Sequence, residues 1–294
     1  MPTLRHTALL FFLLHMLSLH AQEELMNLLE KSEQPVIDYT TATFKTTRIV
    51  IGQSIELPPA KNLLFLISHH FGAINTGYEN LYGLKQATIR LGLEYGITPW
   101  LGIGAGLNTD KNTWDGFIKA KILRQSTGAR KMPLTIDFFT NTAIYTTRWE
   151  EPDRDNLFSS RMSYTFQLMF ARKFGNALSF QITPSLVHKN LVATAEDKND
   201  IFTLGAGGRV KVSQRVSINA EYHYLFPGQV VSTAAYSSFS LGVDIETGGH
   251  VFQVFLTNSY GEYEQAFLTD TRGQWSNGDI FLGFNISRMF TLFY

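Results

Sequence analysis

The strongest constraint in this sequence is an alternation of apolar and polar residues with a period of two, which begins near residue 62 and continues to the C-terminus. Successive side chains of a β-strand point to opposite faces, so the pattern predicts strands with one apolar and one polar face. In 86–97 every odd position is apolar, whereas the even positions are polar, charged or glycine. The same division recurs in 162–174 and 216–226. Because a soluble β-sandwich would also alternate, the pattern alone leaves sandwich and membrane barrel open.

Three further features favour a barrel in a membrane. Short connections, such as 98–99 and 248–249, alternate with long polar ones, as in outer-membrane barrels with short periplasmic turns and longer outer loops. The predicted strands run for about ten residues, which is enough to cross the hydrocarbon layer at a tilt. The chain also ends in an alternating aromatic strand, 289–294, which resembles the C-terminal signal of such barrels.

The sequence therefore predicts an all-β fold, a transmembrane antiparallel up-and-down β-barrel of about twelve strands in the outer membrane of a Gram-negative cell. An even number of strands returns the chain to the side from which it entered. The alternative is a barrel of fourteen strands. The predicted strands are 62–71, 86–97, 100–109, 115–126, 133–147, 160–174, 177–189, 200–213, 215–226, 236–247, 249–258 and 279–292.

Two turns follow from the parity of the apolar faces. A two-residue turn at 248–249 would pair Thr247 with His250 and keep both apolar faces on one side. The apolar faces on either side of Gly175 and Asn176 are both even, so a two-residue turn would place them on opposite sides. We therefore predict a three-residue turn there, with Gly175 or Asn176 at positive φ.

Composition agrees with this fold and excludes other classes. The mean hydropathy of −0.05 is too low for a bundle of membrane helices. The 25 Lys and Arg balance the 25 Asp and Glu, which argues against a nucleic-acid partner. There is no Cys, which excludes disulfides and thiolate metal sites. We predict no cofactor and no metal.

The first residues resemble a secretory signal peptide, over 1–21, with cleavage near Ala21. The alternative, a membrane anchor, needs more apolar residues to span about 30 Å. We predict that 22–61 is a periplasmic N-terminal lead or a plug in the lumen, with a short helix over 23–31, and that 62–294 is the barrel.

The polar faces place a set of charged residues in the lumen. In the first interpretation these side chains form ion pairs that neutralise one another and fill a narrow interior. In the second they line a polar permeation path. Glu221 and His223 form either a proton relay or a hydrogen-bonded filler. We expect this set of charged residues to control permeation. The alternative is that the loop 260–278 folds into the lumen and acts as the gate. The members of the set are Arg90, Glu94, Lys119, Lys121, Asp137, Arg209, Lys211, Glu221, His223, Asp244 and Glu246.

Three functional hypotheses compete. A narrow channel or envelope transport component is favoured, because the lumen is polar and no catalytic set is evident. A lipid hydrolase would depend on Ser68, His69 and His70, which have no assigned acidic partner. A structural barrel that docks periplasmic partners is the third. The acidic loops 150–155 and 196–200 do not have EF-hand spacing, so we interpret them as solvated loops and not as calcium sites.

Arg124, Arg172 and Arg288 fall on the predicted outward face, each at the periplasmic end of a strand. An Arg near the membrane surface reaches lipid headgroups at a cost of only about 0–1 kcal/mol. The three positions support the predicted topology.

Ten runs of the sequence resemble an uncharacterised Bacteroidota outer-membrane β-barrel family, a domain of unknown function. They are 43–48, 68–72, 75–84, 89–92, 115–119, 124–128, 188–192, 205–209, 244–250 and 283–288. The family tends to have Asn-Gly-His-Ser where this chain has 51–54 as Ile-Gly-Gln-Ser. The resemblance implies no established activity. The predicted barrel and its C-terminal signal imply outer-membrane lipid and the barrel-insertion machinery as partners. The family resemblance implies a periplasmic YceI-like lipid-binding protein or c-type cytochrome.

Overall fold

The computed structural model of the chain describes residue 26 and residues 36–149 and 152–292. The predicted signal peptide and the predicted helix over 23–31, apart from Met26, lie outside the described residues. Within the described residues, no helix is long and apolar enough to cross a membrane.

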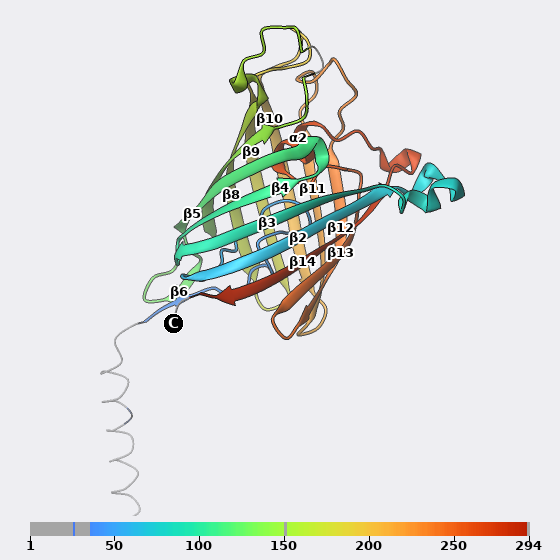
Figure 1. The fold of residues 1–294 in the computed structure, drawn as a ribbon. Coiled ribbons are helices and arrows are strands. Elements are labelled where there is room, and N and C mark those ends of the chain that lie inside the picture. Colours follow the sequence, from blue (N-terminus) through green and yellow to red (C-terminus); the bar gives the residue numbers. More distant parts are fainter. Residues whose placement is uncertain (1–25, 27–35, 150–151, 293–294) are drawn as a thin grey trace, which may run out of the picture. The chain divides into compact units, whose positions relative to one another are not determined.

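Twelve strands of the described part of the chain close into an antiparallel barrel, with each strand paired to its neighbours in sequence order and β14 paired to β2 (Figure 1). The predicted fold class and strand number are confirmed. The barrel strands are β2 (Asn62–Ala73), β3 (Ala87–Thr98), β4 (Leu101–Asn108), β5 (Thr113–Leu123), β7 (Thr135–Tyr145), β8 (Met162–Phe174), β9 (Leu178–Lys189), β10 (Asp200–Lys211), β11 (Val216–Leu225), β12 (Ser238–Thr247), β13 (His250–Thr257) and β14 (Phe281–Thr291).

Short helices lie in the long connections at one end of the barrel, which points to the top and the right of Figure 1. They are the 3-10 helices η1 (Ile74–Thr76), η2 (Tyr78–Gly83), η3 (Asp110–Asn112), η4 (Phe158–Arg161) and η5 (Trp275–Asn277), and the α-helix α2 (Glu264–Thr269). We call this the outer end, because outer-membrane barrels carry their long loops outside.

The two predicted turns are present at the opposite end. Thr247 pairs with His250 across a two-residue turn. Phe174 pairs with Leu178 across a three-residue turn, in which Gly175 has a φ of 63°. A positive φ costs glycine little because it has no Cβ, which explains its position in this turn.

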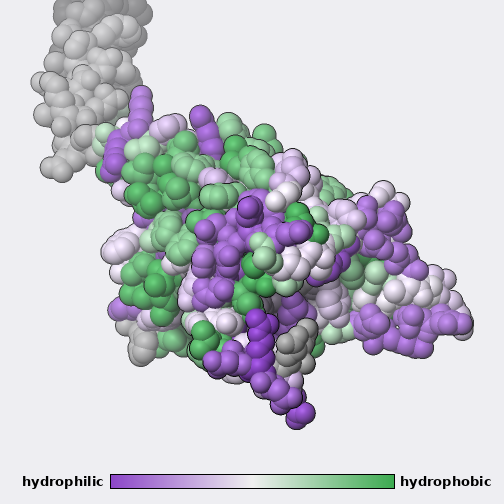
Figure 2. Space-filling view, turned by 90° about the horizontal axis from the view of Figure 1, so that it is seen from above, coloured by the Kyte–Doolittle hydropathy of each residue, from purple (hydrophilic) through white to green (hydrophobic). Residues whose placement is uncertain are grey.

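The two faces of the wall differ as the alternation predicts. On β3, Leu93 is 49% exposed on the outer face, whereas the adjacent Glu94 is 2% exposed in the lumen. Arg172 and Arg288 lie close to the periplasmic ends of β8 and β14, where their guanidinium groups stack over Phe174 and Phe290 at 5.0 and 4.9 Å. The view from above shows hydrophilic residues gathered in the middle and over the projecting part on the right, and hydrophobic residues mainly on the left and upper parts (Figure 2).

The predicted strand 115–126 is wrong at its end. A bulge between Lys121 and Leu123 disturbs the ladder, and β5 ends at Leu123, so that Arg124 follows the strand. The next residues, β6 (Ser126–Gly128), pair with β1 (Ile37–Tyr39) in a separate two-stranded sheet. The described residues thus divide into a small unit, 36–39 and 126–131, and the barrel unit.

Candidate functional site

Residues 43–57 enter the lumen, and we call them the plug segment. Its tip is a tight hairpin in which the Ile49 N–H donates to the carbonyl of Gly52 at 2.9 Å and the Ser54 N–H donates to the carbonyl of Thr47 at 3.0 Å. The apolar tip residues Ile49 and Val50 are buried in one cluster with aromatic side chains of the interior. An apolar tip therefore fills a lumen whose wall is largely polar.

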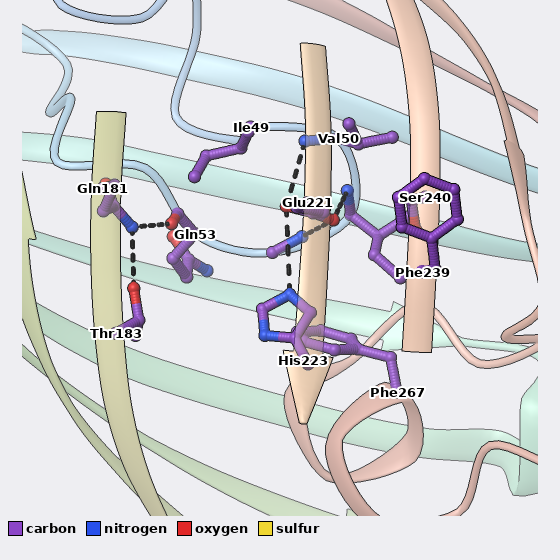
Figure 3. A network of polar contacts seen from close by, with 12 residues as sticks. Ile49, Val50, Gln53, Gln181, Thr183, Glu221, His223, Phe239, Ser240 and Phe267 are labelled. Atoms are coloured by element: carbon purple, nitrogen blue, oxygen red, sulfur yellow. Dashed lines mark hydrogen bonds and ion pairs between the residues drawn. The ribbon is translucent and has the colours of Figure 1, made fainter. Parts of the chain in front are cut away.

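The wall holds the tip through Glu221 of β11 (Figure 3). One carboxylate oxygen of Glu221 accepts the N–H groups of Ile51 and Gly52 at 2.7 and 2.9 Å, and the other accepts that of Val50 at 3.3 Å. These N–H groups are buried, so hydrogen bonds to a carboxylate stabilise them more than bonds to a neutral acceptor would. His223 lies beside them, with Nε2 3.9 Å from Glu221 Oε2.

The close approach requires a glycine at the tip. A Cβ at Gly52 would lie 2.9 Å from His223 Nε2 and 3.1 Å from Glu221 Oε2. A side chain at position 52 would therefore force His223 or the tip itself to shift.

Amide side chains of three other strands bind the main chain of the plug segment. Gln181 donates to the carbonyl of Gln53 at 2.8 Å, and its Oε1 accepts the Ile55 N–H at 3.1 Å. Asn285 donates to the carbonyl of Val50 at 2.8 Å. Gln253 donates to the carbonyl of Ile49 at 3.2 Å. These side chains replace the ladder bonds that an irregular segment lacks.

Two lysines of β5 bind the next part of the plug segment, residues 54–56. Lys119 donates to the carbonyls of Ser54 and Glu56 at 2.9 and 3.1 Å, and Lys121 donates to the carbonyl of Ile55 at 2.9 Å. Both lysines thus bind main-chain carbonyls of the plug segment.

A second insertion enters from the outer end. All six residues of α2 are buried. Glu264 of this helix accepts a hydrogen bond from Gln53 Nε2 at 2.8 Å, which joins the two insertions. Phe267 packs on His223 with 5.0 Å between ring centroids. The loop 260–278, predicted as the alternative gate, therefore supplies part of the lumen filling.

Burial raises the pKa of the two residues that directly precede α2, Glu262 and Tyr263. Desolvation raises the pKa of Glu262 well above its ordinary value, although the charge of Arg90 opposes this shift. One oxygen of Glu262 accepts a hydrogen bond from Asn108 at 3.4 Å, and the other has no hydrogen-bond partner among the described residues. Desolvation also raises the pKa of Tyr263.

The eleven predicted lumen charges do not form one network of mutual ion pairs. Among the described residues, the only ion pair between two of them joins Glu221 and His223. Arg90 instead makes a bidentate pair with Asp115, at 2.8 and 2.6 Å. Glu94 faces Arg48 of the plug segment at 3.5 Å.

The remaining members lie mainly toward the periplasmic end. Asp244 accepts hydrogen bonds from Ser217 and Gln253. Glu246 pairs with Lys45, and Lys211 is half-buried.

Asp137 and Arg209 are buried, and some of their polar atoms lack hydrogen-bond partners among the described residues. Both carboxylate oxygens of Asp137, and Nε and Nη1 of Arg209, have no hydrogen-bond partner among the described residues. Asp137 lies opposite Lys121 in the ladder of β5 and β7.

Asp115 and the amide side chains that bind the plug segment are functional residues that the sequence did not predict. Parity placed Asp115 on the same face as Lys119, so the alternation could have identified it. Nothing in the pattern marks Gln181 or Asn285, because their partners are main-chain atoms distant in sequence.

The hydrolase residues are not assembled as a set. Ser68 and His70 are buried on the lumen face of β2, whereas His69 lies on the opposite face and stacks on Phe284 at 4.9 Å. His70 Nδ1 contacts the carbonyl of Tyr260 at 3.2 Å.

The loop 196–200 is organised by one carboxylate. Asp197 accepts the N–H groups of Val231 and Ser232 at 2.7 and 3.0 Å, and hydrogen bonds with Ser232 lower its pKa. It therefore joins two outer loops. Among the described residues, no group of three or more His, Asp or Glu side chains could hold a metal ion.

Solved structures of bacterial barrels resemble the chain at low identity. The NanC porin is 9% identical over 77% of this chain and 98% of its own, with a TM-score of 0.48. An outer-membrane channel from Pseudomonas putida F1 is 11% identical over 80% and 97%, with a TM-score of 0.48. The Salmonella typhi outer-membrane phospholipase is 12% identical over 85% and 98%, with a TM-score of 0.44.

Most of the chain matches one protein family. A comparison with curated proteins gave no match. The family model described as a membrane bound beta barrel domain, DUF5777, matches residues 44–290, from the plug segment into β14. The resemblance seen in the sequence is confirmed, and an origin in Bacteroidota stays a prediction. The chain belongs to this family of membrane-bound β-barrel domains, and its barrel lies in the outer membrane.

Proposed function

We propose that the protein is a narrow outer-membrane channel that is closed at rest by the plug segment and by α2, and that opens when the plug segment moves. The observation that carries the proposal is the set of wall side chains bound to main-chain atoms of the plug segment, above all Glu221. These side chains are polar, so water can solvate them when the segment leaves.

The energetics favour the closed state. Withdrawal of the tip would expose Ile49, Val50 and Ile51, each of which contributes about 1.5–3 kcal/mol by burial. It would also break the hydrogen bonds to Glu221. Rare opening is therefore expected, and any factor that weakens the wall contacts should increase its frequency.

A cysteine lock tests the proposal, since the natural chain has no Cys. A Cβ at Gly207 of β10 would lie 3.4 Å from Ile49 Cγ2, so Ile49→Cys with Gly207→Cys places two thiols within bridging reach. In planar bilayers the oxidised double variant should show no openings, and reduction should restore them. Each single-cysteine variant is the matched control.

Two results would contradict the proposal. One is a wild-type conductance like that of an open porin that the oxidised lock leaves unchanged. The other is the absence of openings in wild type and in variants that weaken the Glu221 contacts, which would favour a barrel that only docks a YceI-like lipid-binding protein or a c-type cytochrome.

A further inference from the structure

Two adjoining hollows open among the loops of the outer end, with volumes of about 200 and 340 Å³. They adjoin at Lys111, Tyr145, Ser160 and the segment 191–193, which line both of them, and together we call them the outer hollow. Its size is that of a site for a small ligand.

Cations dominate the lining of the outer hollow. The cationic residues are Lys111, Arg148, Arg154, Arg161, Lys189, Lys198 and Arg272. Two acids line it, and both have partners: Asp270 binds Lys189 at 2.7 Å, and Asp197 accepts main-chain N–H groups. The described lining therefore has an excess of positive charge.

Several of these cations are held in place without a carboxylate. Lys111 lies over the ring of Tyr145 at 5.4 Å. Arg161 stacks over Trp149 at 3.8 Å and donates to the carbonyl of Tyr145 at 3.0 Å. Within the described residues, Arg148, Arg154, Lys198 and Arg272 have no ion pair. Positioned cations with unused donors are what an anion requires.

We propose that the outer hollow binds a small soluble anion that carries two or more negative charges. The anion competes with Asp270 for Lys189, and Asp270 directly follows α2, the helix that meets the plug segment through Glu264 and Gln53. Binding therefore loosens the outer insertion. This second step rests on the proposed channel function, whereas the binding step does not.

Calorimetry with the full chain in nanodiscs of phosphatidylethanolamine tests the binding step, with citrate at pH 7 as the probe and glucose as the neutral control. Citrate should bind with an affinity that falls as salt rises. The double variant Lys111→Gln, Arg272→Gln should bind at least about tenfold more weakly, as expected for the loss of charge-assisted hydrogen bonds. Lys85→Gln, on another outer loop, is the matched control and should bind as wild type.

The loop that supplies Arg148 and Arg154 also contains Glu150 and Glu151 in its sequence. The variant Glu150→Gln, Glu151→Gln should bind citrate as well as wild type or more tightly. If citrate binds only to this variant, the loop neutralises its own cations and the proposal is wrong. Equal binding by wild type and the Lys111, Arg272 double variant would also overturn it.

Nanodiscs that contain phosphatidylglycerol distinguish a soluble anion from a lipid headgroup. Citrate affinity should be unchanged in them. Its loss would show that headgroups occupy the hollow, and would overturn the proposed soluble ligand. Because calorimetry does not depend on conductance, citrate binding without any effect on opening would contradict the proposed gating step and leave the binding site intact.

Discussion

At the scale of single residues, Glu221 carries the contact between wall and plug segment. Glu221→Gln replaces one oxygen with an NH₂ group that faces main-chain donors, so we expect the closed state to lose about 2–3 kcal/mol. Opening frequency in planar bilayers should rise at least tenfold. Arg209→Gln is the control, because Nε and Nη1 of Arg209 make no hydrogen bond within the part of the chain that the structure describes, and it should change opening little. Equal effects of both variants would contradict this assignment.

We expect the closure of the proposed channel to depend on pH through Glu262. Its pKa is raised in the folded state by desolvation, so the inserted state favours the protonated form. The stability of the insertion should therefore be highest below the ordinary pKa of a glutamate and should fall as pH rises through the interval up to the raised pKa. Opening frequency measured against pH should rise over this interval.

The variant Glu262→Gln, which stays neutral, should remove most of this dependence and hold the closed state at neutral pH. The same upward trend with pH in Glu262→Gln would assign the effect to another group, such as Asp110, whose pKa desolvation also raises.

At the scale of elements, the hairpin tip is the most demanding fit. Gly52→Ala would bring a Cβ within 2.9 Å of His223, and the resulting overpacking is expected to cost about 1–3 kcal/mol. Trypsin should then cleave after Arg48, which is buried in the native lumen, faster than in wild type. Gly248→Ala, in a turn with open space around it, should leave the cleavage rate unchanged. Unchanged protection of Arg48 in Gly52→Ala would argue against a tightly seated tip.

The barrel strands and the tight turns could be predicted because both depend on local rules. Period-two alternation defines each strand, and the parity of adjacent apolar faces sets the number of residues in a turn. At Gly175, parity predicted both the three-residue length of the turn and the positive φ. The end of β5 was misplaced because a bulge at Lys121 changes the parity, and no residue type there marks a bulge.

At the scale of the whole molecule, depth in the membrane decides what the outer face tolerates. Leu93 lies in the middle of β3 on the outer face, so Leu93→Arg should destabilise the barrel by about 2–4 kcal/mol. Urea titrations in lipid vesicles should show this loss. Arg288→Leu, near the periplasmic end of β14, should change stability by less than about 1 kcal/mol. Equal costs at the two positions would mean that Leu93 does not face the bilayer core.

The sequence by itself determined the barrel, its strand number, its two faces and the charges that face inward, because each follows from alternation along one strand and from the needs of a chain in lipid. Only the tertiary structure decided what those charges do. Glu221 binds the N–H groups of residues 170 positions away, and Arg48 reaches Glu94 across the lumen. Such contacts depend on the path of an irregular segment, whose main-chain groups have the same chemistry at every residue. No local pattern therefore specifies which wall side chain they meet.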